Sequence, residues 1–333
     1  MVVKYHRPPV MRYRRCARLD WDLAEIGYGM WGMGGWTGSD DTESARSLDR
    51  AVALGCNFFD TALAYGDGKS ERLLGQMLER HRSVRLYIAT KVPPLNRQWP
   101  GRATTPVDQV FPYDHVMHSA HTSLLNIGAD AIDLLQLHVW DDAWTGDGGW
   151  QRAAEELKRA GVIRAFGISV NRWEPHNVLR ALDTGLVDAV QVVYNIFDQA
   201  PADVLFPACE RHGAAVIARV PFDEGSLTGA LTRQTRWPDG DFRNMYFAAP
   251  NLALTLDRVD RLQQVASGWG LSLPDLALRF ILAHPAVTTT IPGMRRLDHV
   301  ESNLAASDAA RLDAARLDVL REFRWDRQPD SRS

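Results

Sequence analysis

The chain has 333 residues, of which 45% are hydrophobic and 24% are charged, ordinary proportions for a globular protein with a sizeable core. A formal net charge of -3 gives no indication of a nucleic-acid or anionic-membrane partner, and no apolar run reaches the ~20 residues of a membrane span. Three cysteines without a CxxC pair and an N-terminus without an apolar signal segment favour a reducing, cytoplasmic setting.

Short apolar runs alternate with amphipathic stretches along almost the whole chain. Eight of these runs predict strands, because they are rich in Ile, Val, Leu and Phe and are bounded by glycine, proline or charge. Their near-continuous apolar character indicates burial on both faces, as in a parallel sheet. The predicted strands lie at residues 23–29, 57–60, 86–91, 132–138, 165–169, 188–194, 214–220 and 287–292.

The amphipathic stretches between the strands predict helices, several of which end at a glycine. They lie at residues 42–54, 70–80, 114–127, 150–160, 174–184, 201–211, 254–267, 274–283, 297–306 and 309–323. Eight strands separated by helices predict an α/β fold of the closed (β/α)8 TIM-barrel type. We expect a single barrel domain over residues 11–325, an N-terminal extension over residues 1–10 and a flexible tail over residues 326–333.

Two long loops interrupt the alternation, at about residues 93–113 and 221–250. Both follow predicted strands, so in a barrel both belong to the C-terminal rim, where active sites are built. Because loops of this length inside a compact domain are usually functional covers, we expect them to lie over the site.

Four reactive side chains fall at or just beyond the ends of neighbouring strands. Asp60 ends the second strand and Tyr65 lies in the loop after it, while Lys91 and His138 end the next two strands. Taken alone, each is more often a solvated or structural residue than a catalytic one. Because the strand ends of a barrel point to one rim, all four can converge there.

Together these groups suit the reduction of a carbonyl. The reaction leaves a developing alkoxide that needs a proton, and a tyrosine with a pKa of about 10 donates reluctantly at neutral pH. We expect the ammonium of Lys91 to lower the pKa of Tyr65 while Asp60 holds Lys91 charged. His138 would then align the carbonyl oxygen. None of the four carries a hydride, so a cofactor must supply it.

The segment GCNFFDTALAYGDGKSERLLG, at residues 55–75, resembles the signature of the aldo-keto reductase family, most closely its bacterial-type members. IATK at 88–91 and DLLQLHVW at 133–140 resemble that family's lysine and histidine segments. ELKRAGVIRAFGIS at 156–169 resembles the segment leading to the strand that binds the nicotinamide amide. The similarity extends from about Met11 to the last helix.

This resemblance implies a barrel enzyme that reduces an aldehyde, ketone or keto-sugar, with NADP(H) favoured over NAD(H). It makes Tyr65 the general acid, tuned by Lys91 and Asp60. His138 would orient the substrate, and Trp31 and Trp140 follow strands and are expected to line the substrate pocket. The implied cofactor contacts are Gly29, Met30, Trp31, Asp60, Ser169, Asn171, Gln191, Arg219, Pro221, Phe222, Gly225, Leu227, Gly293, Arg295, His299 and Asn303.

The chain departs from the family pattern at several of these positions. The family often has Ser and Asn side by side, whereas Val170 separates Ser169 from Asn171 here. Arg219 stands where an aromatic ring commonly stacks on the nicotinamide, so its plane could stack or its charge could bind pyrophosphate. Gly293 replaces a lysine often found at the 2′-phosphate site, where Arg295 or Arg296 can supply the charge instead.

Other patterns favour weaker alternatives. Residues 27–32 fit GxGxxG after a strand, but the stretch that follows is a poor helix, which argues against a Rossmann-type dehydrogenase. His115, His118 and His121 lie three residues apart, yet no nearby ligand completes a metal set, so no metal is predicted. An NADP(H)-binding regulatory subunit with little turnover remains an alternative function. The expected partner is a small carbonyl compound. The sequence is compatible with either a monomer or an oligomer.

Overall fold

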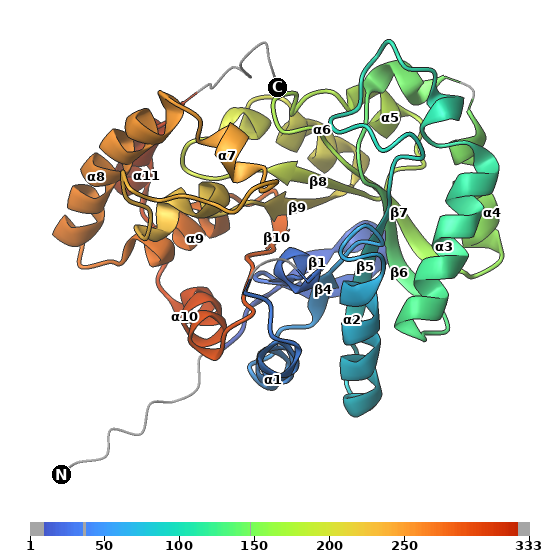
Figure 1. Ribbon diagram of the computed structural model, residues 1–333, viewed down its shortest axis with the longest axis horizontal. Coiled ribbons are helices and arrows are strands. Elements are labelled where there is room, and N and C mark those ends of the chain that lie inside the picture. Colours follow the sequence, from blue (N-terminus) through green and yellow to red (C-terminus); the bar gives the residue numbers. More distant parts are fainter. Residues whose placement is uncertain (1–9, 36–37, 147, 326–333) are drawn as a thin grey trace.

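Eight parallel strands form the central sheet of the computed structural model, which describes residues 10–35, 38–146 and 148–325. The strands follow one another around the sheet in chain order, from β3 to β10 (Figure 1). Their bounds are β3 Tyr28–Gly29, β4 Phe58–Asp60, β5 Tyr87–Val92, β6 Ile132–Leu137, β7 Ile163–Ser169, β8 Ala189–Val193, β9 Ala215–Arg219 and β10 Val287–Thr290.

The sheet closes into a barrel because its first and last strands meet. Parallel bridges join Ile26 to Thr290 and Gly29 to Gly293. A Cβ atom on Gly29 would lie 2.5 Å from the carbonyl oxygen of Ile291, so only glycine permits this approach. The predicted (β/α)8 barrel is confirmed, and the open sheet of a Rossmann-type fold is excluded.

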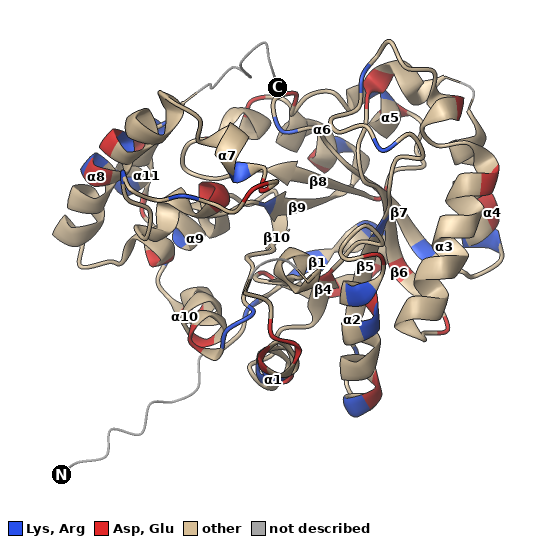
Figure 2. Cartoon of the chain, in the orientation of Figure 1, with Lys and Arg blue, Asp and Glu red and all other residues tan. Residues whose placement is uncertain are grey.

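Helices surround the barrel, and charged residues of both signs lie on them, for example on α2 and α8 (Figures 1 and 2). The bounds are α1 Asp41–Ala53, α2 Lys69–Arg80, α3 Tyr113–Ile127, α4 Gly149–Arg159, α5 Leu179–Asp183, α6 Leu205–His212, α7 Arg243–Tyr246, α8 Asn251–Gly268, α9 Leu273–Ala283, α10 Leu297–Asp308 and α11 Ala314–Arg321. No helix of the described residues is long and apolar enough to cross a membrane.

The predicted strand at residues 23–29 is wrong as a single element. Its first part belongs to β2, Trp21–Ala24, which pairs antiparallel with β1, Tyr13–Cys16, in a hairpin outside the barrel sheet. The ring of Trp21 packs 5.1 Å from that of Tyr87, the first residue of β5. The hairpin therefore covers the end of the barrel where the strands begin, and leaves the opposite end for the long loops.

Three predicted helices begin later than expected. The helix predicted from residue 309 begins at Ala314, as α11. The helix predicted over 174–184 is reduced to α5, because turns occupy the residues after Trp173 and the side chain of Asn177 accepts a hydrogen bond from the Asp142 backbone at 2.8 Å. The helix predicted from residue 201 begins four residues later, after a short 3-10 turn.

The two long loops follow β5 and β9, as predicted, and the second contains the short helix α7. Both therefore belong to the rim formed by the carboxyl ends of the strands. The predicted N-terminal extension, except Val10, and the predicted C-terminal tail lie outside the described residues.

Candidate active site

A buried ion pair lies where β4 and β5 end. Asp60 is the last residue of β4, and the register that aligns it with Ala89 carries Lys91 just beyond it toward the rim. Their exposed fractions are only 2% and 1%. Lys91 Nζ donates to Asp60 Oδ1 at 2.5 Å and to the carbonyl oxygen of Thr61 at 2.7 Å. These bonds offset part of the desolvation that a buried charge pair requires.

Two glutamines complete the surroundings of Asp60. Gln136 Nε2 and Gln191 Nε2 donate to Asp60 Oδ2 at 3.1 Å and 2.8 Å, and Gln191 Nε2 also reaches Gln136 Oε1 at 3.1 Å. All of these side chains are buried, so strands β4, β5, β6 and β8 contribute to one polar layer across the barrel. Gln136 was not predicted as a site residue, although a glutamine inside an apolar strand was a usable signal.

Tyr65 and His138 lie above this layer. Lys91 Nζ is 5.1 Å from the centre of the Tyr65 ring, and the rings of Tyr65 and His138 are 5.6 Å apart at 72°. The loop that carries Tyr65 turns through Gly66, where a Cβ atom would lie 2.1 Å from the carbonyl oxygen of Gly34. The structure thus brings together all four side chains expected to converge.

Burial dominates the protonation of the Tyr65 phenol. It raises the pKa of Tyr65, Asp60 raises it further, and the opposing charge of Lys91 does not compensate. The expected direction of the Lys91 effect is therefore present, but the expected net lowering of the Tyr65 pKa is wrong. Burial lowers the pKa of Lys91 itself, yet Asp60 and Tyr65 outweigh this and keep it above its usual value, so Lys91 is charged.

His138 is neutral at pH 7. Burial, together with the positive charges of Lys91 and Arg219, holds the pKa of His138 well below its usual value. Its Nδ1 atom is buried and has no hydrogen-bond partner within the described part of the chain. The ring of Trp99, from the loop after β5, meets the His138 ring edge-on at 4.5 Å. Such an unpaired buried nitrogen beside a polar layer is a feature of ligand sites.

The sequence profile described as "Aldo/keto reductase family" matches residues 25–324 of the chain. The chain belongs to this family. Its relatives include "Uncharacterized oxidoreductase YqkF" of Bacillus subtilis (strain 168), which is 30% identical over 91% of this chain and 93% of that protein. The "NADH-specific methylglyoxal reductase" of Escherichia coli (strain K12) is 27% identical over 86% of this chain and 90% of its own length.

Solved structures of the family share the fold. The holo form of "aldo-keto reductase AKR11C1" from Bacillus halodurans is 27% identical, with a TM-score of 0.75, covering 95% of this chain and 97% of that one. An aldo-keto reductase from Klebsiella pneumoniae in complex with NADPH is 25% identical, with a TM-score of 0.68, covering 94% and 95% of the two chains. The protein is therefore an aldo-keto reductase, an oxidoreductase of the NAD(P)H-dependent, carbonyl-reducing type.

Several residues expected to contact the cofactor of this aldo-keto reductase lie on the same rim. Ser169 and Gln191 are buried and directly paired in the register of β7 with β8. Arg219 ends β9 and donates from Nη2 to the Val170 carbonyl at 2.9 Å, while its Nε atom is buried without a partner among the described residues. Asn171 differs from these, because its side chain amide bonds the backbone of Gly101 in the loop after β5.

The remaining expected cofactor residues fall into three groups. Gly29, Met30 and Trp31 form the end of β3 and the start of its loop. Pro221, Phe222, Gly225 and Leu227 lie on the turn after β9, where Leu227 is fully buried. Gly293, Arg295, His299 and Asn303 lie after β10 and on α10; Asn303 is buried, and Gly293 and His299 are exposed.

The two predicted pocket tryptophans have different surroundings. Trp31 is 42% exposed, and its ring meets the edge of the Phe242 ring at 5.9 Å, so it reaches across the rim to the second long loop. Trp140 is fully buried and packs against the rings of Trp150 and Trp144 at 5.1 Å and 5.9 Å. Trp140 therefore offers no accessible surface to a substrate and belongs to the core instead.

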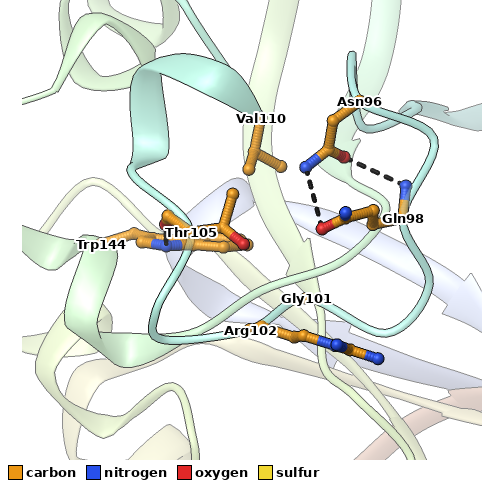
Figure 3. A pocket seen from close by; sticks show the side chains of 7 residues that line it. All are labelled: Asn96, Gln98, Gly101, Arg102, Thr105, Val110 and Trp144. Carbon is orange, nitrogen blue, oxygen red and sulfur yellow. Dashed lines mark hydrogen bonds between the residues drawn. The ribbon is translucent and has the colours of Figure 1, made fainter.

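The loop after β5 also encloses a small pocket of its own (Figure 3). Its side chains converge from one loop and from Trp144, and Asn96 donates to Gln98 Oε1 at 3.4 Å within it. The pocket contains none of the four converging side chains, so we assign it to loop packing rather than to the active site. It is lined by Asn96, Gln98, Gly101, Arg102, Thr105, Val110 and Trp144.

Proposed function

We propose that this aldo-keto reductase reduces a small aldehyde, ketone or keto-sugar to the alcohol with NADPH, with Tyr65 as the proton donor. The observation that supports the proposal is the position of Tyr65 between a charged amine and a neutral imidazole. Lys91 supplies the charge and is fixed by Asp60, while His138 supplies the imidazole. Function resides in such a constellation of side chains rather than in the barrel itself.

Each of these side chains has a separate task in the proposed reaction. The Tyr65 hydroxyl, whose pKa is raised, is fully protonated before reaction and gives its proton to the forming alkoxide. The resulting phenolate is stabilised by the nearby Lys91 ammonium. A neutral imidazole carries one N–H, so His138 can donate to the carbonyl oxygen and direct it toward Tyr65. The nicotinamide of NADPH, when bound, supplies the hydride.

Buried polar side chains at the strand ends suit a dinucleotide at this rim. Ser169 and Gln191 would hold the nicotinamide carboxamide, because both are buried side by side at the strand ends. Arg219, with an unpartnered Nε in the described structure, would contact either the ring or the pyrophosphate. Together these groups provide fixed polar atoms for a polar ligand that enters from the rim.

Arg295 supports NADPH rather than NADH. Arg295 is half-buried, and its guanidinium lies beside Gly38 in the loop after β3, where Nη2 would be 3.4 Å from a Cβ atom on Gly38. A 2′-phosphate there would gain a charge-assisted hydrogen bond. Among the relatives, one structure contains NADPH and one enzyme is named NADH-specific. The preference of this protein is therefore tested by measuring the binding of both cofactors. Arg295→Ala should weaken NADPH about 10-fold or more and leave NADH unchanged.

A turnover screen of aldehydes, ketones and keto-sugars with NADPH and NADH tests the proposed function. We expect turnover with at least one carbonyl class, and Tyr65→Phe should lower kcat by about 10²- to 10⁴-fold while cofactor binding persists. Full activity of Tyr65→Phe would refute the assigned role of Tyr65. Tight NADPH binding without turnover of any carbonyl would instead favour the regulatory-subunit alternative.

A further inference from the structure

Two consecutive residues just beyond β7 contact the two long rim loops, one loop each. Asn171 bonds Gly101 in the loop after β5, and Arg172 bonds Asp223 and Glu224 in the loop after β9. We propose that this dipeptide is a two-sided tie, in which Asn171 positions the substrate-side loop and Arg172 positions the cofactor-side loop. The assignment of the two sides rests on the proposed function.

Both polar atoms of the Asn171 side chain form hydrogen bonds within the protein. Its Oδ1 accepts from the Gly101 N–H at 3.3 Å, and its Nδ2 donates to the Gly101 carbonyl at 3.2 Å. Nδ2 also donates to Glu174 Oε2 at 3.0 Å. A side-chain amide has two N–H donors, and both are therefore engaged. Asn171 is buried, so water does not compete for these bonds.

The tie at Gly101 controls a side chain next to the reacting groups. Trp99 lies two residues before Gly101 and places its ring edge-on to His138 at 4.5 Å. Gly101 lies close to Trp144, because a Cβ atom at this position would be 2.8 Å from Trp144 Cη2. Both residues line the small pocket of this loop (Figure 3). Asn171 is thus a positioning residue that acts on the wall beside His138 through the loop, rather than by touching the substrate.

Arg172 makes more contacts with the other loop. Nη1 donates to Glu224 Oε1 at 2.7 Å, and Nη2 donates to Asp223 Oδ1 at 2.9 Å. Nη2 also donates to the Tyr246 hydroxyl, at 2.8 Å, and to Asp198 Oδ2, at 3.3 Å. Asp223 and Tyr246 lie at the two ends of the loop, 23 residues apart, and bond each other at 2.6 Å. A planar guanidinium suits this several-fold contact, which a lysine cannot reproduce.

The turn held by Arg172 needs outside support. Val220, Asp223 and Glu224 all have positive φ, at 55°, 46° and 55°, a region that non-glycine residues rarely occupy. Such backbone persists where surrounding contacts hold it. The turn also carries Phe222 and Gly225, which are expected to contact the cofactor. Arg172 is therefore placed to set the geometry of the cofactor-side loop.

Hydrogen exchange tests the two ties independently of catalysis. Asn171→Ala should speed amide exchange in residues 93–112 and leave residues 221–250 unchanged. Arg172→Lys, which keeps the positive charge among the carboxylates, should do the reverse. Asn96→Ala and Arg243→Lys are matched controls, because Asn96 bonds Gln98 and Arg243 pairs with Asp241, each within its own loop.

Kinetics add a readout that general destabilisation would not move. Asn171→Ala should raise the carbonyl KM about tenfold and change the NADPH Kd less than about twofold; tenfold corresponds to about 1.4 kcal/mol. Arg172→Lys should raise the NADPH Kd about tenfold and leave the carbonyl KM, at saturating NADPH, within about twofold. Neither control variant should move either constant beyond about twofold.

Three results would overturn the proposal. Equal loosening of both loops by either variant would show one shared scaffold instead of two ties. A raised NADPH Kd with an unchanged KM in Asn171→Ala would make Asn171 a cofactor contact. Exchange unaffected by either substitution would show that the bonds do not hold the loops. If the unmutated protein reduced no carbonyl, the proposed function would fail, while hydrogen exchange would still decide whether the ties exist.

Discussion

Buried carboxylates lie at both ends of the barrel, and their partners differ. At the end covered by the hairpin, Asp133 pairs with Arg85 at 2.5 Å and with Arg164 at 3.2 Å, and these arginine side chains are 51% and 54% exposed. At the rim, Asp60 pairs with Lys91, and neither side chain reaches water. The carboxylate–cation ion pairs are thus partly exposed to solvent at one end of the barrel and fully buried at the other.

The backbone contacts of the two carboxylates explain the difference. Asp133 Oδ2 accepts the N–H of Ile88 on the neighbouring strand at 2.9 Å, so it helps to join β6 to β5. The hydrogen-bond donors around Asp60 are side chains: Lys91, Gln136 and Gln191. The Asp60–Lys91 pair links β4 to β5 through side chains alone. A buried ion pair of this kind is weak evidence for stability, because desolvation offsets its attraction. We infer that the hairpin-end pairs serve the fold and the rim pair serves the chemistry.

The sharpest test of this comparison is Lys91→Met. Removal of the ammonium leaves Asp60 buried without its cation, so the free energy of unfolding should fall by about 3–5 kcal/mol. Turnover should fall by at least about 10²-fold, since the phenolate of Tyr65 loses its stabilising charge. Urea denaturation and steady-state kinetics measure the two effects. A variant with unchanged stability would mean that Asp60 takes up a proton or finds another partner.

The double variant Asp60→Asn, Lys91→Met separates stability from chemistry. With both charges removed, no uncompensated charge remains, and most of the lost unfolding free energy should return, to within about 1 kcal/mol of the unmutated protein. Turnover should stay as low as in Lys91→Met. Recovery of activity along with stability would contradict the assignment of this pair to the chemistry.

The neutral imidazole of His138 at the rim should make the free energy of unfolding fall at acid pH. The unfolded chain binds a proton at His138 near its usual pKa of 6.5, whereas the folded protein, with its lowered pKa, does not. The contribution of His138 to the free energy of unfolding is therefore complete above about pH 6.5. It is lost as the pH falls, by about 1 kcal/mol at pH 5.5. Urea denaturation at two pH values should show this loss in the unmutated protein and not in His138→Gln. Equal losses of unfolding free energy in the two proteins would show that a group other than His138 takes up the proton.

The smallest effect is expected at the hairpin end. Arg85→Met removes a half-exposed cation while Arg164 remains beside Asp133, so the unfolding free energy should change by less than about 1 kcal/mol. The kcat should stay the same, because the pair lies at the far end from Tyr65. This variant is the matched counterpart of Lys91→Met. A loss of activity here would break the division of roles between the two ends.

Most of the barrel was predictable from the sequence, because parallel strands buried on both faces have near-continuous apolar runs. Seven of the eight barrel strands lie where those runs predicted them. The first was not separable, since the apolar run at 23–29 continues from the hairpin strand β2 into β3. In an apolar run this short, the hydrophobic pattern does not distinguish an antiparallel strand from a parallel one.

The site was predictable where strand ends determine it and not where loops do. Asp60, Lys91 and His138 followed from their positions at strand ends, and Tyr65 from the loop directly after one. The surroundings of Asn171 depended on the path of the loop after β5, which no periodicity encodes. Trp140 was expected in the substrate pocket because it follows a strand, but it is buried in the core, and the loop after β5 places Trp99 beside His138 instead.

The seam between β3 and β10 has a consequence for the order of folding. The N–H of Gly27 bonds the Thr290 carbonyl at 2.8 Å, and the N–H of Thr290 bonds the Glu25 carbonyl at 3.0 Å. Contacts between segments so distant in sequence form only after the chain through residue 290 has left the ribosome. Until then the first barrel strand has an unpaired edge, which nascent chains must keep from pairing with one another. The active-site rim is thus completed only after β10 has been synthesised.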